Sequence, residues 1–406
     1  MAGLTRLFGV HQLALAEDVA HDAFCRALEV WKIHGIPENP AAWLMATAKN
    51  RALDRLRRDR TARNFEPELA RHLESEWTLA SAIDEAFEPA AIRDEQLRMM
   101  FSCCHPKLPE EAQLALILNI LCGFGAPEIA AAFLTGRAAI EKRISRGKKA
   151  LAGAKTLFDL ADTAFGARLG TVQRALYLLF NEGYHGASTA TPVRAELCEE
   201  ALRLVALLCE HPPGATPATH ALAALMCLHA ARLPTKLDAA GDLSTLVEQD
   251  RSRWNVERVR EGLQLLELSA RGDELSVYHV EAAIAAEHAS APTFAATNWR
   301  AIVALYDRLM VLAPSPVVAL NRAIAVAERD GAAAGIEALA AITESERLAR
   351  YPFYRAAFGD LELRRGDGHR AVEHFQAALA QARNDAERRF LEKRLAAARA
   401  TAAAAR

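Results

Sequence analysis

Apolar residues recur along most of the chain at the spacing of an α-helix. Leu114, Ile117, Leu118 and Leu121 are a clear example, because positions three, four and seven residues apart lie on one helical face. Long β-branched runs are scarce, and no segment alternates convincingly between apolar and polar residues as a half-buried strand would. The pattern therefore predicts an all-α fold.

The segment NPAAWLMATAKNRALDRLRR (residues 39–58) predicts a helix with two different faces. Asn39 is a candidate N-cap, and Pro40 suits the first helical position. At about 3.6 residues per turn, the apolar face comprises Ala42, Met45, Ala46, Ala52, Leu53 and Leu56. The opposite face comprises Trp43, Thr47, Asn50, Arg51, Asp54, Arg55 and Arg58. Arginine beside tryptophan favours contact with single-stranded nucleic acid; the alternative is that Trp43 packs against a neighbouring helix.

A second two-faced segment, GAPEIAAAFLTGRAAIEKRISRGKKAL (residues 125–151), predicts a helix-turn-helix. Pro127 and Glu128 open a short helix, residues 134–136 supply a turn that contains glycine, and a second helix starts near Arg137. The apolar face of the second helix comprises Ile140, Ile144 and Leu151, and its basic face comprises Lys142, Arg146 and Lys149. A recognition helix needs this division, because its apolar side packs inward while its basic side enters the major groove. A solvated surface helix is the alternative.

Charge is distributed unevenly along the 406 residues, although the net charge is only -2. Residues 49–63 hold seven Lys/Arg against two Asp, and residues 137–149 hold six against one Glu. Between them, residues 64–96 hold nine Asp/Glu against two Arg. Two basic patches on a mildly acidic chain favour two contacts with a polyanion.

Composition excludes several classes of protein. No apolar run reaches the roughly 18–20 residues of a membrane span, and the first residues do not resemble a signal peptide. The seven cysteines lack framework spacing, which indicates a reducing, cytoplasmic setting. Cys103, Cys104 and His105 are adjacent, but adjacent cysteines make poor joint metal ligands, so we expect no metal site and no cofactor.

Together these features resemble a bacterial sigma-70-type initiation factor of the extracytoplasmic-function class. AEDVAHDAFCRALEVW (residues 16–31) looks like the family's polymerase-clamp-binding helix. Residues 39–58 look like the helix that captures the unpaired -10 promoter strand, and residues 108–151 like the domain that reads the -35 element. The resemblance implies a factor that does no covalent chemistry itself and has core RNA polymerase and promoter DNA as partners.

The resemblance also implies a role for individual residues. The polymerase-binding set comprises Glu17, Asp18, Asp22 and Phe24. The set for the -10 strand comprises Trp43, Asn50, Arg51, Arg55 and Arg58. The set for the -35 element comprises Arg137, Lys142, Arg143, Arg146 and Lys149.

Later segments, such as LLFNEGYHGAS (residues 178–188), resemble the long helical extension of one sigma subgroup, which ends in tetratricopeptide-like repeats. The clearest unit covers residues 354–382, and Gly331 precedes Gly366 by 35 residues, near the expected period of about 34. The expected organisation is two small helical sigma domains (1–63 and 93–155) around an acidic linker (64–92), a helical extension (156–310) and repeats (311–406). The family usually has more residues before its first motif, so we expect a shortened first helix or a start further upstream.

Polar and aromatic residues inside the apolar helices of the extension form a candidate pocket. Its members are Asn181, Glu182, Tyr184, Asp250, Arg251, Trp254, His279 and Trp299. The alternative is a set of buried hydrogen-bonded pairs that fix how helices pack. The main hypothesis is a sigma factor regulated by its extension, through a partner protein, a ligand or the sigma domains. Two others stay open: a small-molecule-binding or enzymatic helical domain tethered to promoters, and a tetratricopeptide adaptor with a degenerate DNA-binding end.

Overall fold

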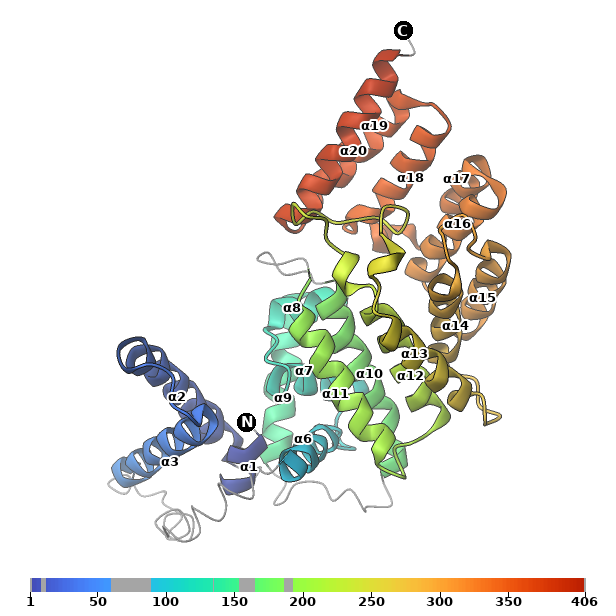
Figure 1. Cartoon of the computed structure of the whole chain (residues 1–406). Coiled ribbons are helices and arrows are strands. Elements are labelled where there is room, and N and C mark those ends of the chain that lie inside the picture. The colour runs from blue at the N-terminus through green and yellow to red at the C-terminus, as the bar shows by residue number, and fades with distance from the viewer. Residues whose placement is uncertain are drawn as a thin grey trace. The chain divides into compact units, whose positions relative to one another are not determined.

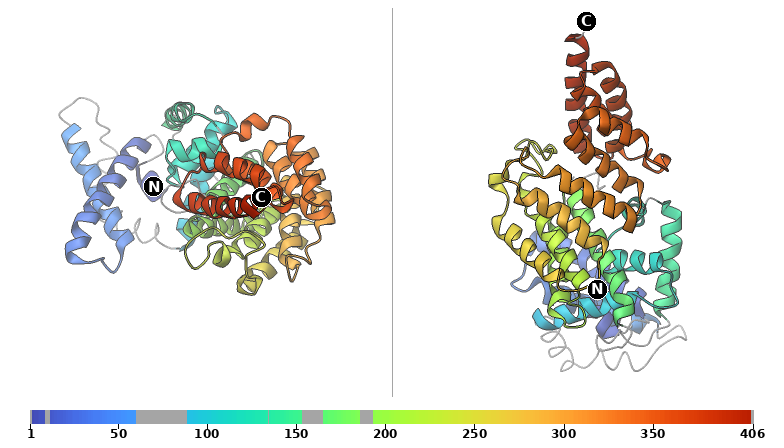
Figure 2. Two further views of the ribbon diagram at one scale, coloured as in Figure 1. Left: turned by 90° about the horizontal axis from the view of Figure 1, so that it is seen from above. Right: turned by 90° about the vertical axis from the view of Figure 1, so that its right-hand side faces the viewer.

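The computed structural model describes residues 2–8, 12–59, 89–133, 135–152, 165–185 and 193–404. Within these ranges the regular structure is helical, and the single β-type pairing is an isolated bridge between Leu237 and Leu243. The all-α prediction is confirmed there. The chain forms two compact units, Met1–Ala175 and Leu176–Arg406, which are described in turn (Figure 1 and, in two further views, Figure 2).

The first unit begins with three helices. They are α1 (Ala2–Phe8), α2 (Leu13–His34) and α3 (Pro40–Asp59). α2 ends at Gly35, whose φ of 78° suits a residue without a side chain. α3 begins as predicted, because the Asn39 side chain accepts a hydrogen bond of 3.0 Å from a backbone N–H of the first turn and Pro40 is the first helical residue. Small residues let α2 and α3 pack closely; the shared core contains Leu4, Phe8, Ala16, Val19, Ala23, Met45, Ala48 and Ala52.

The second part of this unit contains the expected helix-turn-helix. This part comprises α6 (Pro89–Cys103), α7 (Glu110–Ile120), α8 (Ala126–Ala132) and α9 (Arg137–Ala152), and α8 and α9 correspond to the expected helix-turn-helix. α7 is buried along most of its length, and its Leu116 lies against Gly147 of α9. At the start of α8, the Glu128 carboxylate accepts a hydrogen bond of 2.7 Å from the N–H of Gly125. Residues 64–88 of the expected acidic linker, and Leu134 in the turn, lie outside the described residues.

The second unit is a succession of helices joined mostly by short turns. They begin with the last part of α10 (Phe165–His185) and continue with α11 (Ala195–Glu210), α12 (Pro217–Ala230), α13 (Val256–Ser269), α14 (Val277–Ser290), α15 (Trp299–Leu312), α16 (Pro316–Asp330), α17 (Ala332–Ala340), α18 (Pro352–Arg364), α19 (Gly368–Leu379) and α20 (Asp385–Ala404). Side-chain caps set several starts, for example Asn255 before α13 and Asn298 before α15. Within the described ranges, no helix combines the length and the apolar character that crossing a bilayer requires.

From α15 to α20, each helix packs against the next, and α18, α19 and α20 lie side by side in Figure 1. Small residues sit where the axes come close. A Cβ on Gly359 of α18 would lie 2.9 Å from the ring of Phe375 on α19, and a Cβ on Gly368 would meet the backbone of Ala402 on α20. Contacts this close leave room only for glycine, so the glycines fix how these helices pack.

Residues 231–255, which we call the 231–255 loop, connect α12 to α13. Trp254 is buried in this loop, and its Nε1 donates a hydrogen bond of 3.0 Å to the Thr235 hydroxyl. The loop also reaches the C-terminal helix, because the buried Asp242 carboxylate pairs with Arg389 at 2.5 Å and with Lys393 at 2.6 Å. A segment near the start of this unit is therefore tied to its last helix.

Candidate functional site

The exposed side of α2 carries an apolar stripe. Phe24, one of the residues expected to bind polymerase, is 59% exposed, and Leu28, four positions later, is 77% exposed. Residues four apart share a helical face, so the two side chains form one apolar surface in contact with solvent. The expected acidic members are engaged: Glu17 lies 2.6 Å from Lys148, while Asp18 and Asp22 both pair with Arg55.

The basic face of α3 is uneven. Asn50 and Arg51 are exposed, whereas Arg55 is half-buried and bound to the two α2 carboxylates. Trp43 is half-buried and meets the ring of Trp31 edge-on, with 5.4 Å between centroids. The side chain of Arg58 lies outside the described part of the chain. The structure thus brings Asn50 and Arg51 to the surface as a pair, and it packs Trp43 against the neighbouring helix.

The two faces of α9 separate as the periodicity predicts. Ile140, Gly147 and Leu151 are buried against the preceding helices. Lys142, Arg146 and Lys149 are exposed, and the described residues offer them no ion-pair partner. We call these three the α9 basic face.

Three other basic residues of α9 are engaged within the fold, including Lys148, which pairs with Glu17. Arg137 pairs with Glu141 one turn later at 2.7 Å, and Arg143 pairs with Glu111 of α7 at 2.5 Å. Arg143 therefore helps to fix α9 on α7. The three residues of the α9 basic face keep their charges available to an external anion.

Several of the expected pocket residues of the extension have structural contacts within the fold. Asp250 caps a short turn by accepting a hydrogen bond from the Ser252 N–H. Arg251 donates hydrogen bonds to the carbonyls of His288 and Ala291, at 2.5 and 2.6 Å. These contacts hold the 231–255 loop to the end of α14.

Other expected pocket residues also have partners within the fold. His279 caps α14, with Nδ1 2.8 Å from the hydroxyl of Ser276 and Nε2 3.2 Å from the carbonyl of Ser269. The Trp299 ring meets the imidazole of His288 edge-on at 5.3 Å. The pocket as a whole stays a prediction.

Tyr184 is the expected residue with the most distinctive surroundings. Its ring lies 4.1 Å from Lys236 Nζ, 4.6 Å from the His185 ring centre and 5.2 Å from that of His229. Glu182, two residues earlier on α10, is buried. The sequence-based list missed His229, Arg232 and Lys236. His229 is on the last turn of α12, whereas Arg232 and Lys236 lie in the loop after it, so helical spacing in the sequence does not group them.

Burial lowers the pKa of three basic groups near Tyr184, which are Lys236, His229 and His185. It lowers the pKa of Lys236 to about 7, and the like charge of Arg232 lowers it further. It also lowers the pKa of His229 to about 3 and that of His185 well below its usual value. The protein thus makes each of these groups harder to protonate.

The carboxyl group of Glu281, on α14, lies near Tyr177, which precedes Tyr184 on α10. The Tyr177 hydroxyl lies 3.4 Å from Glu281 Oε1, and the Tyr278 ring packs beside Tyr177. Asn181, another expected pocket residue, also forms a side-chain hydrogen bond with Tyr177. Burial raises the pKa of Glu281 to about 7, although its hydrogen bond with Tyr177 acts in the opposite direction.

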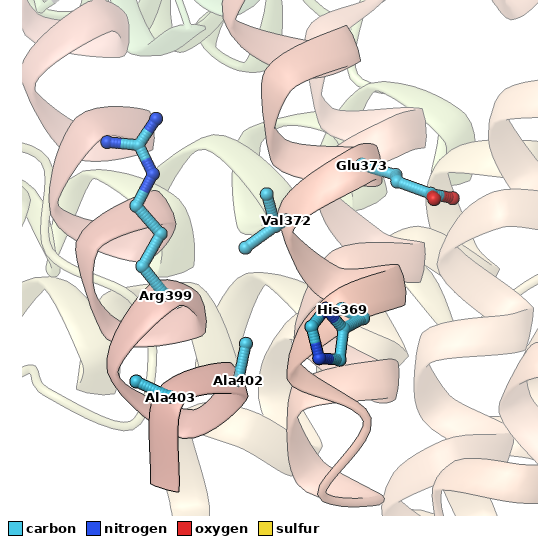
Figure 3. A pocket seen from close by; sticks show the side chains of 6 residues that line it. All are labelled: His369, Val372, Glu373, Arg399, Ala402 and Ala403. Atoms are coloured by element: carbon cyan, nitrogen blue, oxygen red, sulfur yellow. The ribbon is translucent and has the colours of Figure 1, made fainter. Parts of the chain in front are cut away.

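A shallow hollow of about 500 Å³ lies between α19 and α20. Figure 3 shows the residues that line it, with His369, Val372 and Glu373 on one helix and Arg399, Ala402 and Ala403 on the other. Its charged side chains are all exposed, so they are already solvated and have no need of a ligand.

Buried thiols account for the unusual CCH sequence. Cys103 and Cys104 are both buried, and burial raises the pKa of Cys104 to about 12, which favours the unreactive thiol form. Across the described ranges, no group of three or more His, Cys, Asp or Glu side chains could hold a metal ion.

Comparisons with known proteins match the same segments. Residues 3–62 match Sigma-70 region 2, residues 98–151 match Sigma-70, region 4, and residues 168–270 match a family of unknown function, DUF6596. The uncharacterized protein R00370 of Rhizobium meliloti is 38% identical over 398 residues, which cover 97% of this chain and 92% of that protein. No solved structure matches the chain. The chain therefore belongs to the family of R00370, and it is a sigma factor in which promoter-recognising regions 2 and 4 precede a helical DUF6596 extension.

Proposed function

We propose that the protein is a sigma factor of the extracytoplasmic-function class whose extension regulates it in cis. Regions 2 and 4 imply core RNA polymerase and promoter DNA as partners, and these would place the protein in the cytoplasm. The α9 basic face carries the proposal: it is exposed on the second helix of a helix-turn-helix whose opposite face is buried. That is the arrangement of a recognition helix in the major groove.

Region 2 supplies the other two proposed contacts. The exposed stripe of Phe24 and Leu28 suits an apolar surface of the polymerase, since buried aromatic residues dominate many interfaces. Asn50 and Arg51 suit the unpaired -10 strand, because one can hydrogen-bond a base and the other can neutralise a phosphate. Trp43 can take part only through the ring surface that Trp31 leaves uncovered.

We also propose that α16 to α19 form two tetratricopeptide-like units. Gly331 follows α16 and Gly366 follows α18, and both have positive φ, at 95° and 86°. Equivalent glycines 35 residues apart support a repeated helical hairpin. The expected domain boundaries, 1–63, 64–92, 93–155, 156–310 and 311–406, are retained as part of the proposal.

Promoter-dependent transcription with purified core polymerase tests this function. The wild-type protein should direct initiation at its promoter, and a K142E/R146E variant should lose promoter binding while still binding core polymerase. An R300E/R388E variant is the matched control, because it changes the net charge equally at two exposed arginines of the extension. Initiation by K142E/R146E at the wild-type level would refute the assignment of the α9 basic face. Absence of promoter-dependent initiation by the wild-type protein would refute the function.

A further inference from the structure

The basic groups around Tyr184 lack a counter-charge. We call Tyr184, His185, His229, Arg232 and Lys236 the Tyr184 cluster. No carboxylate pairs with Lys236 or Arg232 in the described part of the chain, and the charge that acts most on Lys236 is the like charge of Arg232. The Arg232 Nε instead donates to the side-chain oxygen of Gln249 at 3.2 Å. Buried charges in proteins are usually paired, so this cluster is electrostatically incomplete.

Nearby acids do not complete the cluster. Glu387 is held by Arg383 at 2.5 Å. Glu182 is buried on α10, but it is not among the groups that shift the pKa of Lys236. Residues 186–192, which follow the cluster in sequence, contain no acidic side chain. Neither Glu387 nor residues 186–192 therefore supply an ion-pair partner for Lys236 or Arg232.

Two buried polar atoms point to the same requirement. The Tyr184 hydroxyl has no hydrogen-bond partner although the residue is only 2% exposed, and the Nδ1 atom of His229 is also buried without one. A hydroxyl can donate to an oxyanion, and so can an imidazole N–H. Unpartnered buried groups are rare enough to call for an explanation such as a missing ligand.

Solvent reaches part of the cluster. Lys236 keeps part of its surface in contact with solvent. A small anion could therefore reach the ammonium group without unfolding of the domain. Lys236 also lies over the face of the Tyr184 ring, an arrangement that stabilises an ammonium only partly.

We propose that the Tyr184 cluster is a binding site for a small molecule that carries an oxyanion, either phosphate or carboxylate. Lys236 and Arg232 supply positive charge, and the Tyr184 hydroxyl donates a hydrogen bond to the anion. A bound anion would favour the protonated amine of Lys236, whose pKa burial lowers. The site lies in the second unit, so the proposal stands independently of promoter binding and gives the extension a ligand to sense.

Thermal unfolding of the full chain tests the site. Inorganic phosphate and acetate are titrated separately at constant ionic strength, with chloride as the balancing anion. We expect a saturable rise in melting temperature for the oxyanion that fits and no rise for chloride. An anion that binds the folded protein but not the unfolded chain must raise the melting temperature. Equal shifts with all three anions would overturn the proposal.

Three variants locate the effect. K236M should lose the saturable rise, whereas K107M, which removes an exposed lysine of the first unit, should keep it. K142E/R146E should also keep it, which separates this site from phosphate contacts of the α9 basic face. Retention by K236M would overturn the proposal.

A measurement on the wild-type protein covers the case in which K236M does not fold. Competitive acetylation followed by peptide mass spectrometry gives the pH midpoint of each lysine. The midpoint of Lys236 should lie near 7 without ligand and rise when the oxyanion that fits is added, while that of Lys107 should not change. If neither phosphate nor acetate changes the pH midpoint of Lys236, the proposed site is wrong.

Discussion

Arg55 of α3 is bound to Asp18 of α2 through an ion pair, and the same guanidinium lies 3.4 Å from Asp22. One of the arginines expected at the -10 strand is thus held by two of the acids expected at the polymerase. Arg51, one turn earlier, is exposed. Arginines that look equivalent in the sequence should therefore contribute differently to DNA binding.

The difference can be measured with single-stranded -10 oligonucleotides and the complete polymerase complex. R51A should weaken binding and lower the slope of log affinity against log salt by about 1, as expected for one lost phosphate contact. R55A should change the slope less, and it should cost under about 1 kcal/mol of stability because the pair is partly exposed. The D18N/D22N variant should release Arg55 and tighten binding. A larger effect from R55A than from R51A would contradict the structure.

Gly147 is predicted to be essential for the packing of α9. A Cβ at this position would lie 2.5 Å from Leu116 Cδ1, and Leu116 is fully buried. G147A should therefore destabilise the protein by roughly 1–3 kcal/mol through overpacking. The control is G170A in α10, where an added Cβ meets nothing within 4 Å; it should stabilise the helix by up to about 1 kcal/mol. Chemical denaturation measures both, and equal effects would show that α9 is not packed on α7 in this way.

Glu281 should make stability depend on pH. Its pKa is about 7 in the folded protein, above the ordinary value of 4.5 for a glutamate, so the folded state holds the proton more tightly than the unfolded state. Stability from this group is present below pH 4.5 and is lost as pH rises through 7. E281Q should remove that loss, which raises stability above neutral pH by roughly 1–3 kcal/mol. The free energy of unfolding is measured against pH for the wild-type protein and E281Q, with E287Q on the same helix as the control. Parallel curves for the wild-type protein and E281Q would contradict the role of Glu281.

Elements that depend on local pattern could be predicted from the sequence. The start of α3 at Asn39 and Pro40 follows from capping preferences, and the division of α9 into a buried and a basic face follows from periodicity. The matched sigma-70 regions coincide with the motifs that carry the resemblance. In these cases a single helix contains all the information needed.

Features that depend on packing between elements could not be predicted in the same way. The pairing of Arg55 with Asp18 exists because α2 and α3 lie side by side, which residues 37 positions apart do not reveal. Lys236 is in an irregular loop without periodicity, so no pattern placed it over Tyr184. His279 looked like a pocket residue because a buried histidine and a capping histidine are alike in sequence.

The bond between Asp242 and Arg389 joins residues 147 positions apart. This separation determines how long after Asp242 the ribosome adds Arg389. A ribosome adds about 5–20 residues per second, so Arg389 is made on the order of ten seconds after Asp242. Regions 2 and 4 precede both residues and emerge earlier still. Each new molecule therefore synthesises regions 2 and 4 before the residues that tie the 231–255 loop to α20, so the extension is the last part of the protein to complete its fold.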